Sequence, residues 1–313
     1  MLLLMLDVYR LRVLLEFAER GTIAATAASL GYTPSAVSQQ LAALERETGA
    51  ALLDRTARTA ELTEAGRLLA AHAAEILARI EAAEADLASP EPVGRVAISA
   101  FPTAAVAFAP ALTRTVRANP GLCLVLRQTA GGEVLRQVRA GQADVAIVDD
   151  WSGRLGADQP ALRFYPLLTD PLVLVLPRRH WAADDQVPVS LYRLRDEAWL
   201  ATPAGEASRR AMDQVLAAIG GPAEPPSQFD GLATILSLVA RGVGVAILPQ
   251  LTLAAGDARV AVRKLPGRQV ARDLYAVARA SSVRRPAVAL IIEALTTAAR
   301  GLPGGAGQAA PED

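Results

Sequence analysis

The sequence predicts an α/β protein: a winged helix-turn-helix head at the N-terminus, a long linker helix, and an α/β domain of two subdomains. Three observations predict this order. Residues 22–48 show two short helical patterns separated by a glycine, residues 63–88 keep one helical apolar period, and residues 94–278 alternate between strand-like and helix-like segments. The 313 residues exceed the length of one typical domain.

The first short helix is predicted just after Thr22, a residue that can cap a helix start. Its apolar face carries Ile23, Ala27 and Leu30 at helical spacing. Gly31 follows and can end the helix, because glycine readily takes a positive φ.

A second helix is predicted to open at Thr33 and Pro34, a cap followed by a first-turn proline. Its inward stripe is Val37, Leu41 and Leu44. The other face begins with side chains that can bond base edges or phosphates, namely Ser35, Ser38, Gln39 and Gln40. Two helices with a tight turn and a polar second helix are typical of a major-groove reader. The same caps also occur in ordinary helical hairpins, so this pattern alone leaves both interpretations open.

Two short strands around a turn are predicted next, at 52–55 and 61–63. They would form a wing beside the second helix. Arg55 and Arg58 lie in or near this turn, where their guanidinium groups could hold phosphates.

These motifs together resemble the N-terminal half of the LysR-type transcriptional regulators, and the resemblance extends over nearly the whole chain. The matching segments are Tyr9 to Glu19, Ala24 to Leu30, Ala36-Val37-Ser38, Ala43-Leu44-Glu45 and Leu62-Thr63-Glu64-Ala65-Gly66. The resemblance implies a regulator of transcription that binds double-stranded DNA. One departure is Pro34, which stands one place earlier than the usual proline of the family. It shifts the expected base contacts to Ser35, Ser38 and Gln39.

The full set of expected DNA-binding residues is Thr22, Thr33, Pro34, Ser35, Ser38, Gln39, Gln40, Arg55 and Arg58. Residues 1–62, the expected DNA-binding domain, contain six arginines and seven acidic residues, so their net charge is −1. A strongly basic surface is therefore absent. We expect a homodimer or homotetramer, because two heads on one duplex would compensate for a weak electrostatic contribution from each.

A linker helix is predicted over 63–90, with a seam of Ala65, Leu69, His72, Ile76, Ile80, Ala83 and Leu87. Such a helix could pack on its own domain. In the LysR-type family the corresponding helix pairs with that of a second copy, and the resemblance implies the same here.

The remaining domain is predicted over 91–300, with subdomain I at about 91–165 plus 270–300 and subdomain II at about 166–269. Strands are predicted at 94–100, 122–128, 144–148, 172–176, 198–201, 244–248 and 273–278, and helices at 104–119, 133–141, 207–219, 232–241 and 286–299. This β-α-β-α-β order predicts a parallel sheet with helices on both faces. The resemblance implies an effector-binding domain similar in fold to periplasmic binding proteins. Residues 301–313 are expected to form a disordered tail.

Effector contacts are expected where strands end and helices begin, because free backbone N–H groups gather there. The candidates are Thr103, Thr129, Thr202 and Asp230. The family often uses the positions that match the three threonines, although for each residue taken alone we favour simple helix capping. Hydroxyls and backbone groups suit a small organic acid as effector. Asp149-Asp150, at the end of a predicted strand, is interpreted first as a solvated loop and second as a contact for a cation.

Other function classes find little support in the sequence. Cys123 is the only cysteine, and the two histidines, His72 and His180, form no pair, so we expect no catalytic residues, no metal site and no cofactor. The apolar start at 1–6 is too short for a signal peptide, and no segment has the length of a membrane span. A solute-binding transport protein would require export. We therefore expect a cytoplasmic protein of bacterial type that is not an enzyme and does not bind membranes.

Overall fold

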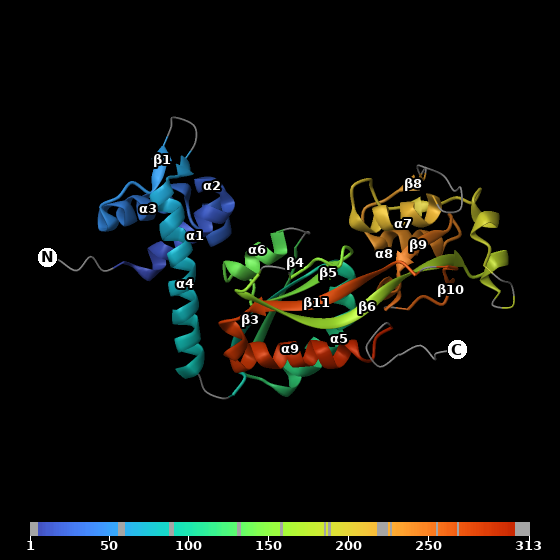
Figure 1. Cartoon of the computed structure of the whole chain (residues 1–313). Helices are drawn as coiled ribbons and strands as arrows, with labels where there is room; N and C mark the ends of the chain where they lie inside the picture. Colours follow the sequence, from blue (N-terminus) through green and yellow to red (C-terminus); the bar gives the residue numbers. More distant parts are fainter. Residues whose placement is uncertain are drawn as a thin grey trace.

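The computed structural model describes residues 6–303 except 56–59, 88–90, 130–132, 157–158, 185, 187–188, 218–224, 226, 255 and 268. Figure 1 shows a small helical head, a long helix that leaves it, and a larger α/β domain. This order confirms the predicted fold class. No helix in the described part of the chain is long and apolar enough to cross a membrane. The expected tail lies outside the described residues from 304 onward.

The head packs three helices around one apolar core. They are α1 (Val8–Arg20), α2 (Ile23–Leu30) and α3 (Pro34–Thr48), and Leu14, Phe17, Leu41 and Leu44 are fully buried between them. Each helix starts at a side-chain cap and ends at a glycine with positive φ. The caps are Asp7, Thr22 and Thr33, and the glycines are Gly21, Gly31 and Gly49. The predicted caps at Thr22 and Thr33 are therefore confirmed.

The wing consists of the antiparallel strands β1 (Leu53–Arg55) and β2 (Ala60–Leu62). The chain leaves it through Thr63, whose N–H donates to the Leu52 carbonyl at 3.0 Å and whose hydroxyl accepts from the Gly66 N–H at 3.0 Å. A Cβ atom at position 66 would lie 2.2 Å from the same Leu52 carbonyl oxygen. Gly66 thus lets the next helix begin in close contact with the backbone of the wing.

Helix α4 (Glu64–Leu87) buries one face against α1 and exposes another. Ala70 and Ala73 lie in the core of the head. On a different face Leu68 is 62% exposed and Ile76 37% exposed, with His72 also exposed between them. An apolar stripe of the linker helix is therefore open in the single chain.

The large domain is built on a seven-stranded mixed sheet in the order β10-β6-β11-β5-β3-β4, with β9 also paired to β6. Its strands are β3 (Gly94–Ala100), β4 (Leu122–Gln128), β5 (Val145–Asp150), β6 (Leu162–Pro177), β9 (Ala246–Pro249), β10 (Val260–Lys264) and β11 (Ala271–Arg279). Strand β3 is parallel to β4 and β5, whereas β6 is antiparallel to β9, β10 and β11.

Helices cover both faces of the first half of this sheet (Figure 1). On one face α5 (Pro102–Ala118) and α9 (Pro286–Ala299) pack against Ala276 and the other β11 residues of the same parity. On the opposite face α6 (Val134–Arg139) packs against Val277. The alternation of neighbouring β11 residues between two cores is what the pleat of a strand requires.

The strands of the predicted β-α-β-α-β set, β3, β4 and β5, are parallel as predicted, but the sheet as a whole is mixed, because β11 runs antiparallel to β5 and β6. The predicted strand at 172–176 is only the second part of β6, which begins at Leu162. Pro166 and Pro171 interrupt the earlier part and argue against a strand when the sequence is taken alone. Pro166 is accommodated because it lies opposite Tyr275, where the register shifts.

The second half of the domain has its own apolar cores around β6, β9 and the buried Trp199. Its further elements are the parallel strands β7 (Leu200–Ala201) and β8 (Ser227–Gln228) and the helices α7 (Ala207–Ala217) and α8 (Leu232–Val239). Short 3-10 turns occur at Trp181–Ala183, Leu191–Leu194, Gln250–Leu253 and Ser282–Arg284. Strands β8 and β10 were not predicted from the sequence.

A buried charge pair lies where β6 and β11 run from one half to the other. The Arg272 guanidinium donates to Asp170 Oδ2 through Nε at 3.0 Å and Nη2 at 2.9 Å, and to Asp149 Oδ2 at 3.0 Å. Asp170 is 0% exposed, and its other oxygen accepts from the Leu251 N–H at 2.8 Å. The Phe101 ring lies 4.7 Å from the guanidinium carbon. These contacts join β5, β6, β11 and the turn after β9.

We expect Arg272→Met to lower the free energy of unfolding by about 3–5 kcal/mol, because it leaves the buried Asp170 carboxylate without its cation. Adding Asp170→Asn removes the charge and still lets a side-chain oxygen accept from Leu251, so the double variant should recover most of the loss. Urea unfolding of the parent, the Arg272→Met variant and the double variant measures this. If the free energy of unfolding of Arg272→Met lies within about 0.5 kcal/mol of that of the parent, the charge pair contributes little to stability.

Candidate nucleic-acid interface and effector site

The start of α3 is the first candidate site, and side-chain caps define its geometry. Thr33 Oγ1 accepts from the Ala36 N–H at 3.2 Å, and Thr22 Oγ1 accepts from the Ala25 N–H at 3.2 Å. Gly31 makes the turn between the two helices with φ of 73°. Pro34 has no N–H, and the N–H groups of Ala36 and Val37 are bonded to Thr33, so this helix start offers few backbone donors for an anion.

The polar residues of α3 fall into two groups. Pro34, Ser35 and Gln39 are exposed, as expected for residues that would contact a duplex, and Ser38 is partly buried at the edge of this face. Gln40 differs, since its Oε1 accepts from Arg10 Nε of α1 at 3.1 Å. Part of the hydrogen-bonding capacity of Gln40 is thus used inside the head.

The wing residues are described less completely. Arg55 is the last residue of β1, and Arg58 lies outside the described residues. Arg10 of α1 forms an ion pair with Glu47 near the end of α3. This arginine therefore supports the helix from inside the head.

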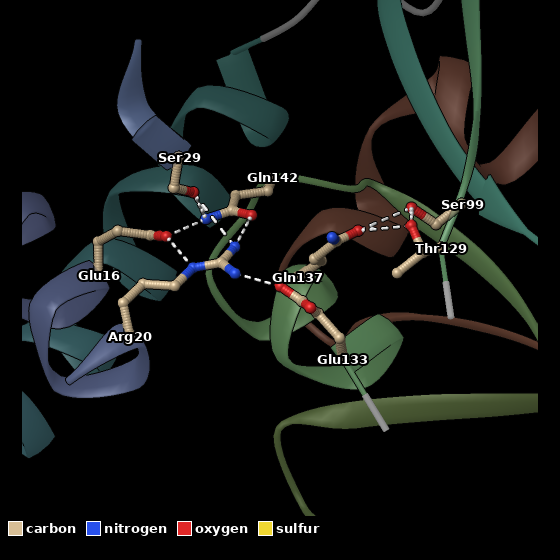
Figure 2. A network of polar contacts seen from close by, with 8 residues as sticks. All are labelled: Glu16, Arg20, Ser29, Ser99, Thr129, Glu133, Gln137 and Gln142. Atoms are coloured by element: carbon tan, nitrogen blue, oxygen red, sulfur yellow. Dashed lines mark hydrogen bonds and ion pairs between the residues drawn. The ribbon is translucent and has the colours of Figure 1, made fainter. Parts of the chain in front are cut away.

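Thr103 and Thr129 both belong to the first half of the large domain, near the carboxyl ends of β3 and β4. Thr103 lies in the first turn of α5, and its Oγ1 accepts from Arg272 Nη2 at 3.2 Å. Thr129 follows β4, and its hydroxyl lies 3.0 Å from Gln137 Oε1 and 3.2 Å from Ser99 Oγ. Figure 2 shows the side chains of Ser99, Thr129 and Gln137 converging.

Thr202 and Asp230 belong to the second half, after the parallel strands β7 and β8. Thr202 is buried, its hydroxyl lies 3.2 Å from Ser208 Oγ, and its carbonyl accepts from Arg209 at 3.2 Å. Asp230 is exposed just before α8. All four candidates therefore lie at the ends of strands, but Thr202 has the internal contacts of a structural residue.

Three residues that surround the candidates of the first half were not predicted from the sequence, namely Ser99, Gln137 and Arg272. Asp149 accepts from Arg272 at 3.0 Å and from the Trp151 indole N–H at 3.0 Å. The sequence signal for Arg272 was weak, because β11 also carries Asp273 and Arg279. The acceptors of the buried Arg272 come from distant segments of the chain.

The expectation that Asp150 lies in a solvated loop was wrong. Asp150 is buried and accepts from the backbone N–H groups of Ser152, Gly153 and Leu155 at 2.8, 3.1 and 2.7 Å. Burial alone would raise the pKa of this carboxyl, but the N–H groups of Leu155, Ser152 and Gly153 and the Ser152 hydroxyl outweigh burial, and the pKa is lowered. Asp150 therefore shapes the turn that follows β5.

Two family models match the chain. Residues 8–67 match the bacterial regulatory helix-turn-helix protein, lysR family, and residues 89–300 match the LysR substrate binding domain. Together these matches cover the head and the large domain.

Relatives of known sequence and structure agree with these matches. The chain is 30% identical over 249 residues to the HTH-type transcriptional regulator IlvR of Caulobacter vibrioides. The aligned residues cover 78% of this chain and 82% of the relative. It is also 29% identical over 274 residues to an uncharacterized HTH-type transcriptional regulator, YfeR, of Shigella flexneri. This alignment covers 86% of this chain and 87% of the relative.

The fold is similar to that of a full-length OxyR variant of Pseudomonas aeruginosa, with a TM-score of 0.69, 19% identity and coverage of 99% of both chains. It is also similar to full-length CbnR complexed with the target DNA, with a TM-score of 0.52, 21% identity and coverage of 94% of this chain and 99% of that one. The chain, with a LysR helix-turn-helix domain followed by a LysR substrate-binding domain, belongs to the LysR family of transcriptional regulators.

Proposed function

We propose that the protein binds promoter DNA as a homodimer or homotetramer and responds to a small-molecule effector in its C-terminal domain. The exposed, side-chain-capped start of α3 carries this proposal, since it presents Ser35 and Gln39 on the outer surface of a helix-turn-helix head. A relative of the same fold has been described in complex with its target DNA. We place the protein in the bacterial cytoplasm, where its DNA lies, and propose that it is not an enzyme.

The proposed division of the chain follows these roles. Residues 1–62 bind DNA, 63–90 form the linker helix, and 91–300 bind the effector. Base contacts are assigned to Ser35, Ser38 and Gln39, with Arg55 and Arg58 on phosphates.

The proposed effector site uses Thr103 and Thr129 from one half and Thr202 and Asp230 from the other. Hydroxyl groups donate well to carboxylates, so a small organic acid fits the first pair. Arg272 lies beside Thr103, but its guanidinium already donates to two carboxylates. It therefore positions Thr103 and is not the main source of charge for the ligand.

Pairing of two copies through α4 follows from its open stripe. Leu68, His72 and Ile76 recur at spacings of four residues and are exposed in the single chain. Apolar residues at this spacing favour contact with a second helix. Two copies of a head whose net charge is −1 would then contact one operator together.

Gln39→Glu should weaken operator binding roughly ten- to hundredfold, because it replaces an exposed base-contacting amide by a charge that phosphates repel. Fluorescence anisotropy with the DNA upstream of the protein's own coding region measures the affinity. Gln186→Glu is the matched control, since it makes the same change at an exposed position of the effector domain. Equal affinities for the parent and a folded Gln39→Glu variant would refute the assignment of α3.

Replacing both Leu68 and Ile76 by Glu should convert the oligomer to a smaller species, because four charges would face each other in the paired helices. Glutamate is a good helix former, so α4 itself should persist. Sedimentation velocity reports the mass, and Val243→Glu is the control, since Val243 is also exposed but lies in a loop. A double variant that retains the parent mass would exclude pairing through this face of α4.

A further inference from the structure

The head and the effector domain touch through a polar cluster that the DNA-binding and effector sites do not use. It consists of Glu16, Arg20 and Ser29 from the head and Glu133 and Gln142 from the effector domain, called here the interdomain network (Figure 2). The three head residues lie on α1 and α2, and the two others flank α6. Residues more than 100 positions apart in the sequence are thus in direct contact.

Gln142 is the centre of the interdomain network. Its Nε2 donates to Glu16 and, at 2.7 Å, to Ser29 Oγ, while its Oε1 accepts from Arg20 Nη2 at 2.8 Å. Both amide hydrogens and the amide oxygen of Gln142 are therefore bonded to the head. Arg20 also pairs with Glu133. Glu16 is only 2% exposed, so its carboxylate needs these partners while the head and the effector domain are in contact.

Gln137 connects the interdomain network to Thr129. Its side-chain Oε1 accepts from the hydroxyls of Ser99 and Thr129, at 3.0 Å each. Its backbone carbonyl accepts from the N–H groups of Gln142 and Ala143, at 2.9 and 3.2 Å. A single residue of α6 is thus bonded at one end to the proposed effector site and at the other to the residue that contacts the head.

We infer that the interdomain network holds the DNA-binding head against the effector domain, and that an effector bound at Thr129 weakens this contact through Gln137. The inference rests on the proposed effector site. The Thr129 hydroxyl has one hydrogen, so it cannot donate fully to both Gln137 and a ligand carboxylate. A ligand that accepts this hydrogen leaves Gln137 with one donor fewer and frees α6 to shift. The head then changes its angle while its own fold is kept.

The contact leaves the DNA-reading surface open. The exposed residues at the start of α3 are not members of the interdomain network, whose head residues come from α1 and α2. In the view of Figure 1, α3 lies on the side of the head away from the effector domain. The network thus sets the orientation of the head without covering its DNA-binding surface.

Spin-label distances test the inference without DNA or ligand. Labels are placed in the full chain by Ala24→Cys and Glu293→Cys, both at exposed positions outside the network, with Cys123→Ser removing the native thiol. Dilution with unlabelled chain suppresses distances between copies. We expect one narrow distance in the parent. Gln142→Leu, Gln137→Leu and Thr129→Val should each broaden it or add a longer distance.

Gln159→Leu is the matched control, because Gln159 bonds to Arg139 near the same surface but is not in the network. Its distance distribution should equal that of the parent. If Gln142→Leu keeps the narrow distance, the network does not hold the head. If Gln142→Leu alters the distance but Gln137→Leu and Thr129→Val do not, the link to the effector site is refuted. Failure of operator binding would refute the proposed function and leave these distances unaffected.

Discussion

The burial of α1 is the constraint on which the arrangement of the chain depends. Leu11, Leu14 and Phe17 have almost no exposed surface, and the helix packs against α2, α3 and α4 at once. Because α1 contacts both α3 and α4, neither helix can turn without the other while the apolar core is intact. The head therefore moves as one body, and its orientation can be changed only at its outer contacts.

One of those outer contacts, the interdomain network, has a different chemistry from the core. The interdomain network consists of charged and amide side chains, whereas the core of the head is apolar. When polar groups separate, water can replace the lost partners, so breaking such a contact costs less than opening an apolar core. Interfaces between domains of one chain are commonly polar for the same reason. This contrast makes the head rigid inside and adjustable as a whole, as the proposed regulation requires.

The sequence was sufficient for features that depend on local chemistry. The caps Thr22 and Thr33, the positive φ of Gly31 and the bounds of α9 follow from residues a few positions apart, and the structure has them where they were predicted. The antiparallel pairing of β6 was not predictable in this way, since a strand direction is set by partners over 100 residues away. Arg272 and Gln142 were missed for the same reason, because their acceptors come from distant segments.

The weak charge of the head explains why its orientation should matter so much. A strongly basic domain binds any duplex and tolerates small errors of angle, because most of its affinity comes from counterion release. Residues 1–62 have a net charge of −1, so more of the affinity of the proposed dimer must come from the simultaneous fit of two α3 helices into two half-sites. Two linked heads lose the affinity gained from simultaneous binding when the distance and angle between them no longer match the spacing of the half-sites. A small rotation released at Gln142 would then change operator occupancy without altering any residue that contacts DNA.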